Sequence, residues 1–171
     1  MSGATITITI DDRQVGRALR GIAAIGRSPA QLLGAISVGL VRNTQDRFDD
    51  ETAPDGSAWA PLNPLYASGK RRPGILRESG MSGGLQGSIT GEVQGHSVVV
   101  GSNKIYAAVH QFGATITPRA GKALHFMMGG QKIVARSVTI PARPYLGLST
   151  RDEETIQEAA EDALDAVLRR A

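Results

Sequence analysis

Residues 28–51 read SPAQLLGAISVGLVRNTQDRFDDE and carry apolar positions at a helical period. These positions recur at steps of three or four residues, at Leu33, Ile36, Leu40, Thr44 and Phe48. The spacing puts them on one face and predicts a long core helix that ends near residue 50. Ser28-Pro29 is typical of an N-cap followed by proline at the first helical position. Gly34 and Gly39 each cost a helix about 1 kcal/mol relative to Ala, which indicates close packing there.

Two shorter elements are expected before this helix. Residues 5–10 read TITITI, and strict alternation of β-branched residues predicts a half-buried strand. Asp11 and Asp12 can then cap a short helix that runs to about Ile25. Its apolar residues share one face of that helix: Val15, Leu19 and Ile22.

The chain after the long helix is irregular. Residues 52–74 contain four prolines and an Asp-Gly turn, so a long loop is expected. Within it, Asn63-Pro64 can start one helical turn that runs through Ala67. Residues 75–88 show only a weak helical pattern broken by glycine. Loops of this length in a compact domain are usually functional or mobile.

Strands are expected in the middle of the chain. Ile89–Val93 and Ser97–Gly101 predict a hairpin around Gln94-Gly95-His96. Tyr106–Phe112 is predicted to be a short helical or extended segment ended by Gly113. Further strands are predicted over residues 114–118, 123–128 and 132–140, with Gly129-Gly130 as the turn between the last two.

A second long helix is predicted at the C-terminal end. Ser149 and Thr150 open it, Asp152 and Glu153 follow at the spacing of a capping box, and it runs to Arg170. Its apolar stripe consists of Ile156, Ala160, Ala163, Leu164, Val167 and Leu168. We therefore expect one α+β domain over residues 1–171. A mixed or antiparallel sheet packs on the long helix, a C-terminal helix covers 149–170, and long mobile loops lie chiefly at 52–88.

The charge of the chain is unevenly distributed. The 171 residues carry a net charge of +3. Residues 1–60 hold six Arg against seven acids, residues 61–145 hold ten Lys and Arg against two acids, and residues 146–171 hold three Arg against seven acids. The segments thus carry −1, +8 and −4. The acidic end can pack near the basic segment of its own chain, contact the basic segment of a neighbouring subunit, or leave that segment to bind nucleic acid phosphates.

Several classes of protein do not fit this composition. The absence of cysteine excludes disulfides, thiolate zinc sites, iron–sulfur clusters and cysteine nucleophiles. No apolar run is long enough for a membrane span, and the N-terminal residues lack the pattern of a secretory signal. The sequence therefore predicts a soluble protein without membrane contact, acting in the compartment where it is made.

No constellation of residues indicates catalysis or a cofactor. His96, His110 and His125 are not spaced as metal ligands, and no phosphate loop or GxSxG elbow occurs. The carboxylates at 49–51 could hold a divalent ion, but a solvated helix end is the strongly favoured interpretation. We expect no catalytic residue, no bound metal and no cofactor, and therefore not an enzyme.

Binding candidates come from two parts of the long loop. Lys70, Arg71 and Arg72 form a basic run between glycine and proline, suited either to phosphate contacts or to an exposed, soluble loop. Trp59, the single tryptophan, can anchor either the core or an interface.

Four segments of the chain stand out as an ordered set. They are Phe48 with Pro54-Asp55-Gly56 and Trp59-Ala60-Pro61-Leu62; Gly74-Ile75-Leu76 with Ser79-Gly80, Leu85 and Ser88-Ile89; Val100-Gly101-Ser102 with Tyr106-Ala107 and His110-Gln111-Phe112-Gly113; and Ile140-Pro141-Ala142-Arg143-Pro144-Tyr145-Leu146-Gly147-Leu148. Together they span residues 48–160, and in this order they resemble the phage virion morphogenesis family, the tail completion proteins of Mu-like tailed phages. Met81-Ser82-Gly83-Gly84 departs from the family's usual pattern before Leu85.

The resemblance implies a structural subunit of the virion that joins the tail to the head. Such a tail completion or tail terminator subunit forms a homo-oligomeric ring, expected to be a hexamer, at the head–tail neck, after assembly in the host cytoplasm. Its implied partners are the tail tube, the head–tail connector proteins and double-stranded DNA, which passes the lumen without sequence-specific contacts.

The residues can be placed on this implied ring. Lys70, Arg71 and Arg72 are the candidates for facing the lumen and its DNA. The candidates for a subunit or partner interface are Trp59, Arg143, Tyr145, Asp152 and Glu153. Arg143 lies between two prolines that fix the backbone, so its side chain is expected to be presented to a partner.

Three alternatives remain open from the sequence. The first is a head–tail connector subunit, an adaptor or a stopper. The second is a free basic DNA-binding protein, although few aromatic residues are available to stack on bases. The third is an enzyme that acts on nucleic acid or cell wall through the carboxylates at 49–51.

Overall fold

The computed structural model describes residues 13–78 and 83–170, and the strand expected at Thr5–Ile10 lies outside them. In chain order the elements are α1 (Arg13–Arg27), α2 (Ala30–Asp50), α3 (Pro64–Ser68), the 3₁₀ turn η2 (Gln86–Ser88), β1 (Ile89–Gln94), β2 (Ser97–Ser102), α4 (Ala107–Phe112), β3 (Ala114–Ile116), β4 (Leu124–Met128), β5 (Gln131–Ala135), β6 (Val138–Ile140) and α5 (Thr150–Leu168). Helices followed by antiparallel strands and a last helix confirm the α+β class.

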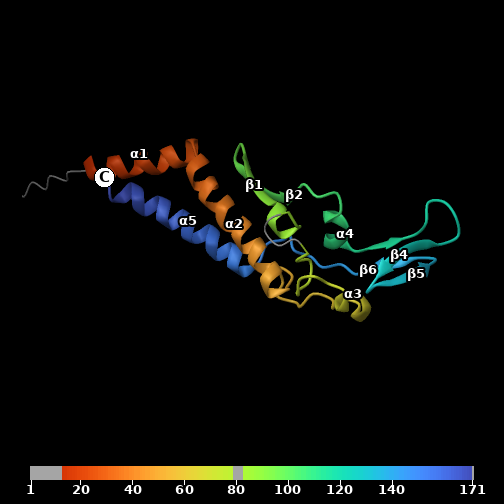
Figure 1. Cartoon of the computed structure of the whole chain (residues 1–171). Coiled ribbons are helices and arrows are strands. Elements are labelled where there is room, and N and C mark those ends of the chain that lie inside the picture. The colour runs from red at the N-terminus through yellow and green to blue at the C-terminus, as the bar shows by residue number, and fades with distance from the viewer. Residues whose placement is uncertain (1–12, 79–82, 171) are drawn as a thin grey trace, which may run out of the picture.

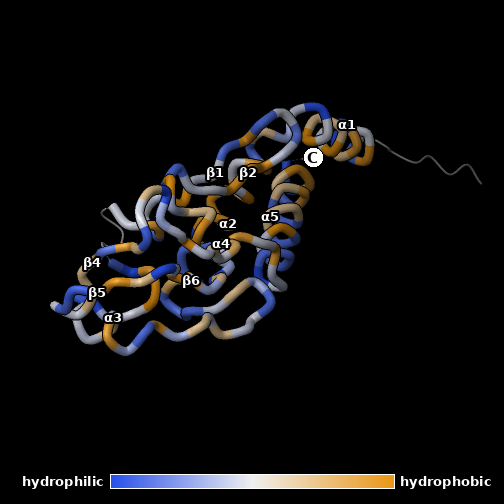
Figure 2. The backbone as a smooth tube through the Cα atoms, turned by 90° about the vertical axis from the view of Figure 1, so that its right-hand side faces the viewer, coloured by the Kyte–Doolittle hydropathy of each residue, from blue (hydrophilic) through white to orange (hydrophobic). Residues whose placement is uncertain are grey.

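The subunit is elongated, with three helices at one end and the β4–β5 hairpin at the other (Figure 1). Helix α5 runs back along α2 and continues beside α1. Figure 2, turned by 90°, also places β4 and β5 far from α1 and α5. The two ends are therefore separate surfaces of one chain.

The N-cap of α2 lies one residue later in the chain than expected. Pro29, rather than Ser28, is the N-cap of α2, and no side chain caps the first turn. The two helices meet at a bend of 61°. No single helix among the described residues is long and apolar enough to cross a membrane, whereas α1 and α2 meet that criterion of length and composition only when taken together across the bend.

Glycines let α5 approach the other two helices closely. A methyl group at Gly39 of α2 would overlap the side chain of Thr155, and one at Gly21 of α1 would overlap that of Val167. The close packing predicted for Gly39 is confirmed. It is wrong for Gly34, where an added Cβ would have no described neighbour within 4 Å.

The apolar stripe expected to bury α1 faces mostly solvent. Val15, Leu19 and Ile22 are exposed, and α1 contacts α5 through the neighbouring stripe that includes Gly21. Gly21 allows a short distance between the two helices at this point, and the larger apolar side chains lie on the neighbouring face.

Within the described residues, the strands form three antiparallel sheets of two strands each, β1–β2, β3–β6 and β4–β5. In the first, Ile89 pairs with Ser102 and Gln94 with Ser97, across the Gly95-His96 turn. Residues 132–140, expected to be one strand, are divided between β5 and β6. The predicted Gly129-Gly130 turn is confirmed, with both residues at positive φ, as a tight hairpin requires.

The core lies where α2 meets the long loop and the β1–β2 hairpin. Phe48 is fully buried there, with its ring centroid 5.4 Å from that of Trp59 and 5.2 Å from that of Tyr145. The remaining buried members are Ala53, Ile75, Leu85, Ile89 and Ala107. Much of the 52–88 segment is therefore tied to the core, although α3 and η2 are its only helical turns among the described residues.

Candidate functional site

A buried polar cluster joins α2 to the start of α5. Arg47 of α2 forms an ion pair with Asp152, and its Nη2 also donates to Ser149 Oγ at 2.9 Å. Its Nη1 donates to the carbonyls of Tyr145 and Gly147 at 3.0 and 3.1 Å. The Arg47 side chain therefore fixes the segment that leads into α5.

Asp152 has a second role as the N3 residue of α5. Ser149 and Asp152 form the predicted capping box, with the Ser149 amide donating to Asp152 Oδ2 at 2.8 Å. Asn43 Nδ2 donates to Asp152 Oδ1 and to Thr155 Oγ1, both at 3.0 Å. Burial raises the pKa of Asp152, but the hydrogen bonds from Ser149 and Asn43 and the charge of Arg47 outweigh burial and hold it below its usual value.

Arg143, Tyr145 and Trp59 fasten the segment at 140–148 to the long loop. Arg143 Nε donates to the Ala60 carbonyl at 2.8 Å and its Nη2 to that of Pro61 at 3.0 Å. Trp59 Nε1 donates to the Pro144 carbonyl at 2.7 Å. The expectation that Arg143 presents its side chain to a partner is wrong for the isolated subunit, since only 5% of Arg143 is exposed.

Gln111 completes this junction from α4. Its Oε1 accepts from the amides of Tyr145 and Leu146 at 3.0 Å, and its Nε2 donates to the Leu146 carbonyl at 2.9 Å. Three of the four segments singled out in the sequence, those around Trp59, Gln111 and Arg143, thus meet in one place. No role was assigned to Asn43 or Arg47 from the sequence, and Gln111 appeared only as part of one of the four segments. The signal for Arg47 was a charged residue beside Phe48 on a core helix.

The five interface candidates thus divide into two groups. Trp59, Arg143, Tyr145 and Asp152 are buried with partners in their own chain, whereas Glu153 is exposed on α5. Nothing in the structure tests their contact with another subunit. The geometry gives the four buried residues the role of holding the long loop, the 140–148 segment and α5 together.

The three cations at residues 70–72 of the long loop differ in their exposure to solvent. Lys70 Nζ lies 2.8 Å from Glu78 Oε1 and donates to the Gly74 carbonyl at 2.6 Å, with only 5% of its side chain exposed. Arg71 and Arg72 are exposed, and Arg72 borders a shallow cavity with Asp46 and Asp49. Two of the three predicted DNA-facing cations are therefore on the surface, and Lys70 is engaged within the loop.

A cavity of about 460 Å³ lies between α3, α4, β6 and the chain around residue 85. Tyr66 Oη donates to Glu78 Oε1 at 2.5 Å, and burial together with Glu78 raises the pKa of Tyr66 to about 12. His110 Nδ1 is buried without a hydrogen-bond partner among the described residues. Burial and the nearby Arg143 lower the pKa of His110, so the ring is neutral at pH 7. The lining is mostly apolar, and its polar groups do not form a nucleophile–base pair.

The carboxylates at 49–51 serve the fold. Asp49 pairs with Arg77 at 3.1 Å and accepts from Gln86 Nε2 at 3.2 Å. Glu51 ends α2 in the left-handed region, and its Oε1 accepts from the Ile75 amide at 2.7 Å. No group of three or more histidine, aspartate or glutamate side chains that could hold a metal ion occurs among the described residues.

The exposed acids of α5 and the exposed cations of the hairpin end form two surfaces of opposite charge, while α1, beside α5, carries the exposed Arg17, Arg20 and Arg27. The solvent-facing side of α5 contains Glu153, Glu154, Glu158, Glu161, Asp162 and Asp165, all exposed. The hairpin end carries the exposed cations Arg119, Lys122, Lys132 and Arg136, and residues 93–151 contain no acid. In the described part of the chain, none of these ten side chains forms an ion pair.

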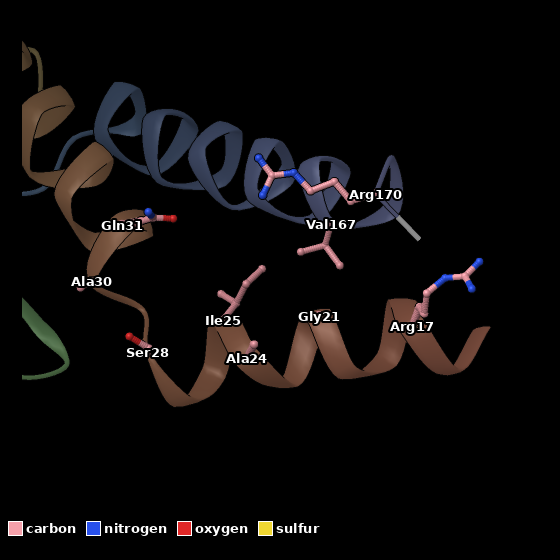
Figure 3. Close-up of a pocket in the computed structure, with 9 residues that line it drawn as sticks. All are labelled: Arg17, Gly21, Ala24, Ile25, Ser28, Ala30, Gln31, Val167 and Arg170. Atoms are coloured by element: carbon pink, nitrogen blue, oxygen red, sulfur yellow. The ribbon is translucent and has the colours of Figure 1, made fainter. Parts of the chain in front are cut away.

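Another cavity, of about 520 Å³, lies in the open groove between α1 and α5. Figure 3 shows Val167 of α5 pointing at Gly21 of α1, with Ile25 beside it and Arg17 toward the open end. The middle of the groove is apolar, Ser28 and Gln31 lie near the bend between α1 and α2, and the described residues hold no set of converging polar groups. The groove is a result of helix packing rather than a ligand site.

A comparison of the whole chain with known families matches the phage virion morphogenesis family over residues 10–165. The chain belongs to this family. The match extends well before the four segments that suggested it, to include α1 and α2, and it ends within α5. Membership places the protein among those that build the phage virion.

Two relatives of this family member come from Mu and a Mu-like prophage. The putative capsid assembly protein G of Escherichia phage Mu is 27% identical over 96% of this chain and 97% of its own length. The Mu-like prophage FluMu G protein 2 of Haemophilus influenzae is 36% identical over half of each chain. No solved structure matches this chain.

Proposed function

We propose that this member of the phage virion morphogenesis family is a tail completion, or tail terminator, subunit that forms a homo-oligomeric ring at the head–tail junction. In this role it closes the end of the tail tube and joins the tail to the connector proteins of the head. Double-stranded DNA passes through the lumen without sequence-specific contacts. The proposal includes no catalytic step and no cofactor.

The observation that carries the proposal is the separation of charge along an elongated subunit. Exposed acids lie on α5 and exposed cations lie at the hairpin end, and the two surfaces are far apart in Figures 1 and 2. A chain whose two ends complement each other associates head to tail, and such contacts close into a ring when the rotation between subunits allows it. Family membership supplies the setting, which is virion assembly.

The name of the Mu relative points to the head, since it describes a putative capsid assembly protein. A ring at the neck contacts both the head and the tail, so the proposal is compatible with that description. A connector subunit on the head side is the alternative that the name favours. The experiment must therefore separate these positions.

Removal of the gene from its phage, followed by electron microscopy of the lysate, separates the positions. A tail terminator predicts filled heads, tails of irregular length and few joined particles. A connector predicts tails of normal length beside heads that lose DNA, and a role in the capsid shell predicts the loss of heads. Addition of the purified protein to the mutant lysate should restore joined particles, and immunogold labelling should place it at the neck. Normal infectious particles from the deletion would reject the proposal.

The oligomeric state gives an independent test. Light scattering at two protein concentrations and two salt concentrations should show a species several times the mass of the 18.0 kDa chain. Salt should weaken it because exposed charges are screened within about 8–10 Å at 0.10–0.15 M ionic strength. A chain that stays monomeric and is absent from purified particles would contradict the ring.

A further inference from the structure

We infer that the outer face of the β4–β5 hairpin of one subunit docks on the solvent-facing side of α5 of the next subunit. The inference rests on the proposed ring and names the two surfaces that would build it. The occupant of each surface is a second copy of this chain.

The outer face of the hairpin is both apolar and basic. The register pairs His125 with Val134 and Met127 with Lys132, which puts these four side chains on one face. Met127 is 66% exposed and Val134 is 60% exposed, although both are large apolar residues. The opposite face, which includes Phe126 and Ile133, is partly buried. A protruding hairpin that exposes its apolar side chains toward solvent is suited to binding a protein surface.

The exposed side of α5 complements the hairpin face because it carries both apolar and acidic side chains. Leu164 and Leu168 are 40% and 55% exposed and lie one turn apart. Glu161 lies three positions before Leu164 and Asp165 three positions before Leu168, so carboxylates flank the apolar pair on the helix surface. Glu154 and Glu158 continue the acidic ridge toward the start of the helix. Met127 or Val134 would contact the two leucines, and oppositely charged side chains of the two subunits would pair around this apolar contact.

Within one subunit, the hairpin face and the exposed side of α5 do not contact each other. The hairpin lies at one end of the molecule, and α5 runs from the middle of the molecule to the other end (Figures 1 and 2). Within the described residues, the ion pairs of α5 come from Asp152 and Arg151 at its start, and the hairpin contributes none. The charges are thus unpaired in the monomer and complementary between copies, which favours an intermolecular contact.

The turn of the hairpin, three residues before Lys132, is supported by a contact with the α3 region. The backbone of Gly129 in its turn approaches Gly69 and Leu65 of the α3 region so closely that a Cβ at Gly129 would overlap the Leu65 carbonyl and side chain. The hairpin turn is therefore packed against the long loop. A preorganised docking element loses little entropy on binding.

Charge reversal tests the contact with two variants. Each variant alone should not assemble, whereas a mixture of the two should assemble. Lys132→Glu with Arg136→Glu reverses two cations of the hairpin, and Glu158→Lys with Glu161→Lys reverses two acids at the centre of the α5 ridge. Each variant alone brings like charges together and should lose the species of higher mass in light scattering. An equimolar mixture restores complementarity at every contact of an alternating assembly, so the high-mass species should return. Arg20→Glu with Arg42→Glu, which changes the same charge on exposed helix positions, is the matched control and should assemble normally.

Chemical cross-linking in purified particles keeps the inference testable if assembly needs a template. A zero-length carbodiimide should join Lys132 to a carboxylate of α5, and mass spectrometry of particles from mixed ¹⁴N- and ¹⁵N-labelled subunits should show both labels in the same cross-link. Assemblies of the normal mass from both reversed variants, or particles without any hairpin–α5 cross-link, would overturn the contact and leave the proposed function standing. Absence of the protein from the neck of particles would instead reject the proposed function.

Discussion

Arg47 and Asp152 form a buried ion pair between the last turns of α2 and the first turn of α5, with 7% and 2% of their side chains exposed. Arg47 also holds the carbonyls of Tyr145 and Gly147, and Asp152 caps its own helix. The pair therefore determines where α5 starts and in which direction it leaves the core. In a subunit whose acidic α5 surface is proposed to bind a neighbour, this direction sets the geometry of the ring.

Replacement of Asp152 by Asn should destabilise the subunit by about 3–5 kcal/mol, because it leaves the buried Arg47 guanidinium without a counter-charge. Urea unfolding followed by circular dichroism measures this loss. The matched control is Glu153→Gln, which removes an exposed carboxylate from the adjacent position and should change stability by less than about 0.5 kcal/mol. Equal effects of the two substitutions would show that the ion pair does not stabilise the fold.

The stabilisation from Asp152 should depend on pH with a defined sign. Its pKa is lowered in the folded chain, so the unfolded chain binds the proton first as pH falls. The contribution is present above the ordinary aspartate value of about 3.9 and is lost as pH falls toward the folded value. The difference in unfolding free energy between the wild type and Asp152→Asn should be constant from pH 7 to pH 5 and shrink below about pH 4. A difference that stays constant down to pH 3 would contradict this assignment.

Two glycines of α2 should respond in opposite ways to the same substitution. Gly39→Ala should destabilise the protein by about 1–3 kcal/mol, because the new methyl group overlaps the Thr155 methyl group of α5. Gly34→Ala should stabilise it by up to about 1 kcal/mol, since the position is helical and open. Thermal unfolding of both variants measures the contrast.

The double variant Gly39→Ala with Thr155→Ser isolates the cause. It removes the obstructing methyl group and keeps the Thr155 oxygen that accepts from Asn43. Most of the stability lost in Gly39→Ala should return. If the double variant is as unstable as Gly39→Ala, the methyl group of Thr155 does not limit how closely α5 approaches α2.

Arg143→Ala should lower the stability of the folded subunit, and any loss of assembly should follow from that lower stability. The substitution removes the donors of the Ala60 and Pro61 carbonyls and should cost about 1–3 kcal/mol. Arg143→Lys retains the charge but not the two-pronged geometry, so it should recover only part of this loss. Melting temperature and light scattering of the same samples separate the two effects. A variant with the normal melting temperature that fails to form the high-mass species would restore the idea that Arg143 acts at an interface.

The sequence was informative wherever a structure depends on near neighbours. The helical period of residues 30–50, the Ser149–Asp152 capping box and the Gly129-Gly130 hairpin turn were all predicted, because each depends on residues within a few positions of one another. The Asn63-Pro64 start of α3 was predicted for the same reason, and the Asn63 side chain accepts from the Leu65 amide at 2.9 Å. The charge blocks could also be counted from the sequence.

Predictions failed where the outcome depended on packing. Gly34 and Gly39 look alike in sequence, but only Gly39 faces α5. Val15, Leu19 and Ile22 form a regular apolar stripe, yet the subunit leaves them exposed because α1 meets α5 through the face that includes Gly21. Arg143 between two prolines suggested a presented side chain, and the fold directs it inward to two carbonyls more than 80 positions away.

By itself the sequence determined the long helices, the hairpins at residues 89–102 and 124–135, the separation of charge along the chain and the family to which the chain belongs. The tertiary structure alone decided that Trp59, Arg143 and Tyr145 hold the subunit together, and that the acidic and basic surfaces lie far apart. The physical reason is the length of chain between partners. Arg47 and Asp152 are 105 positions apart, and no local pattern encodes a contact that forms only when the core has brought α2 and α5 together.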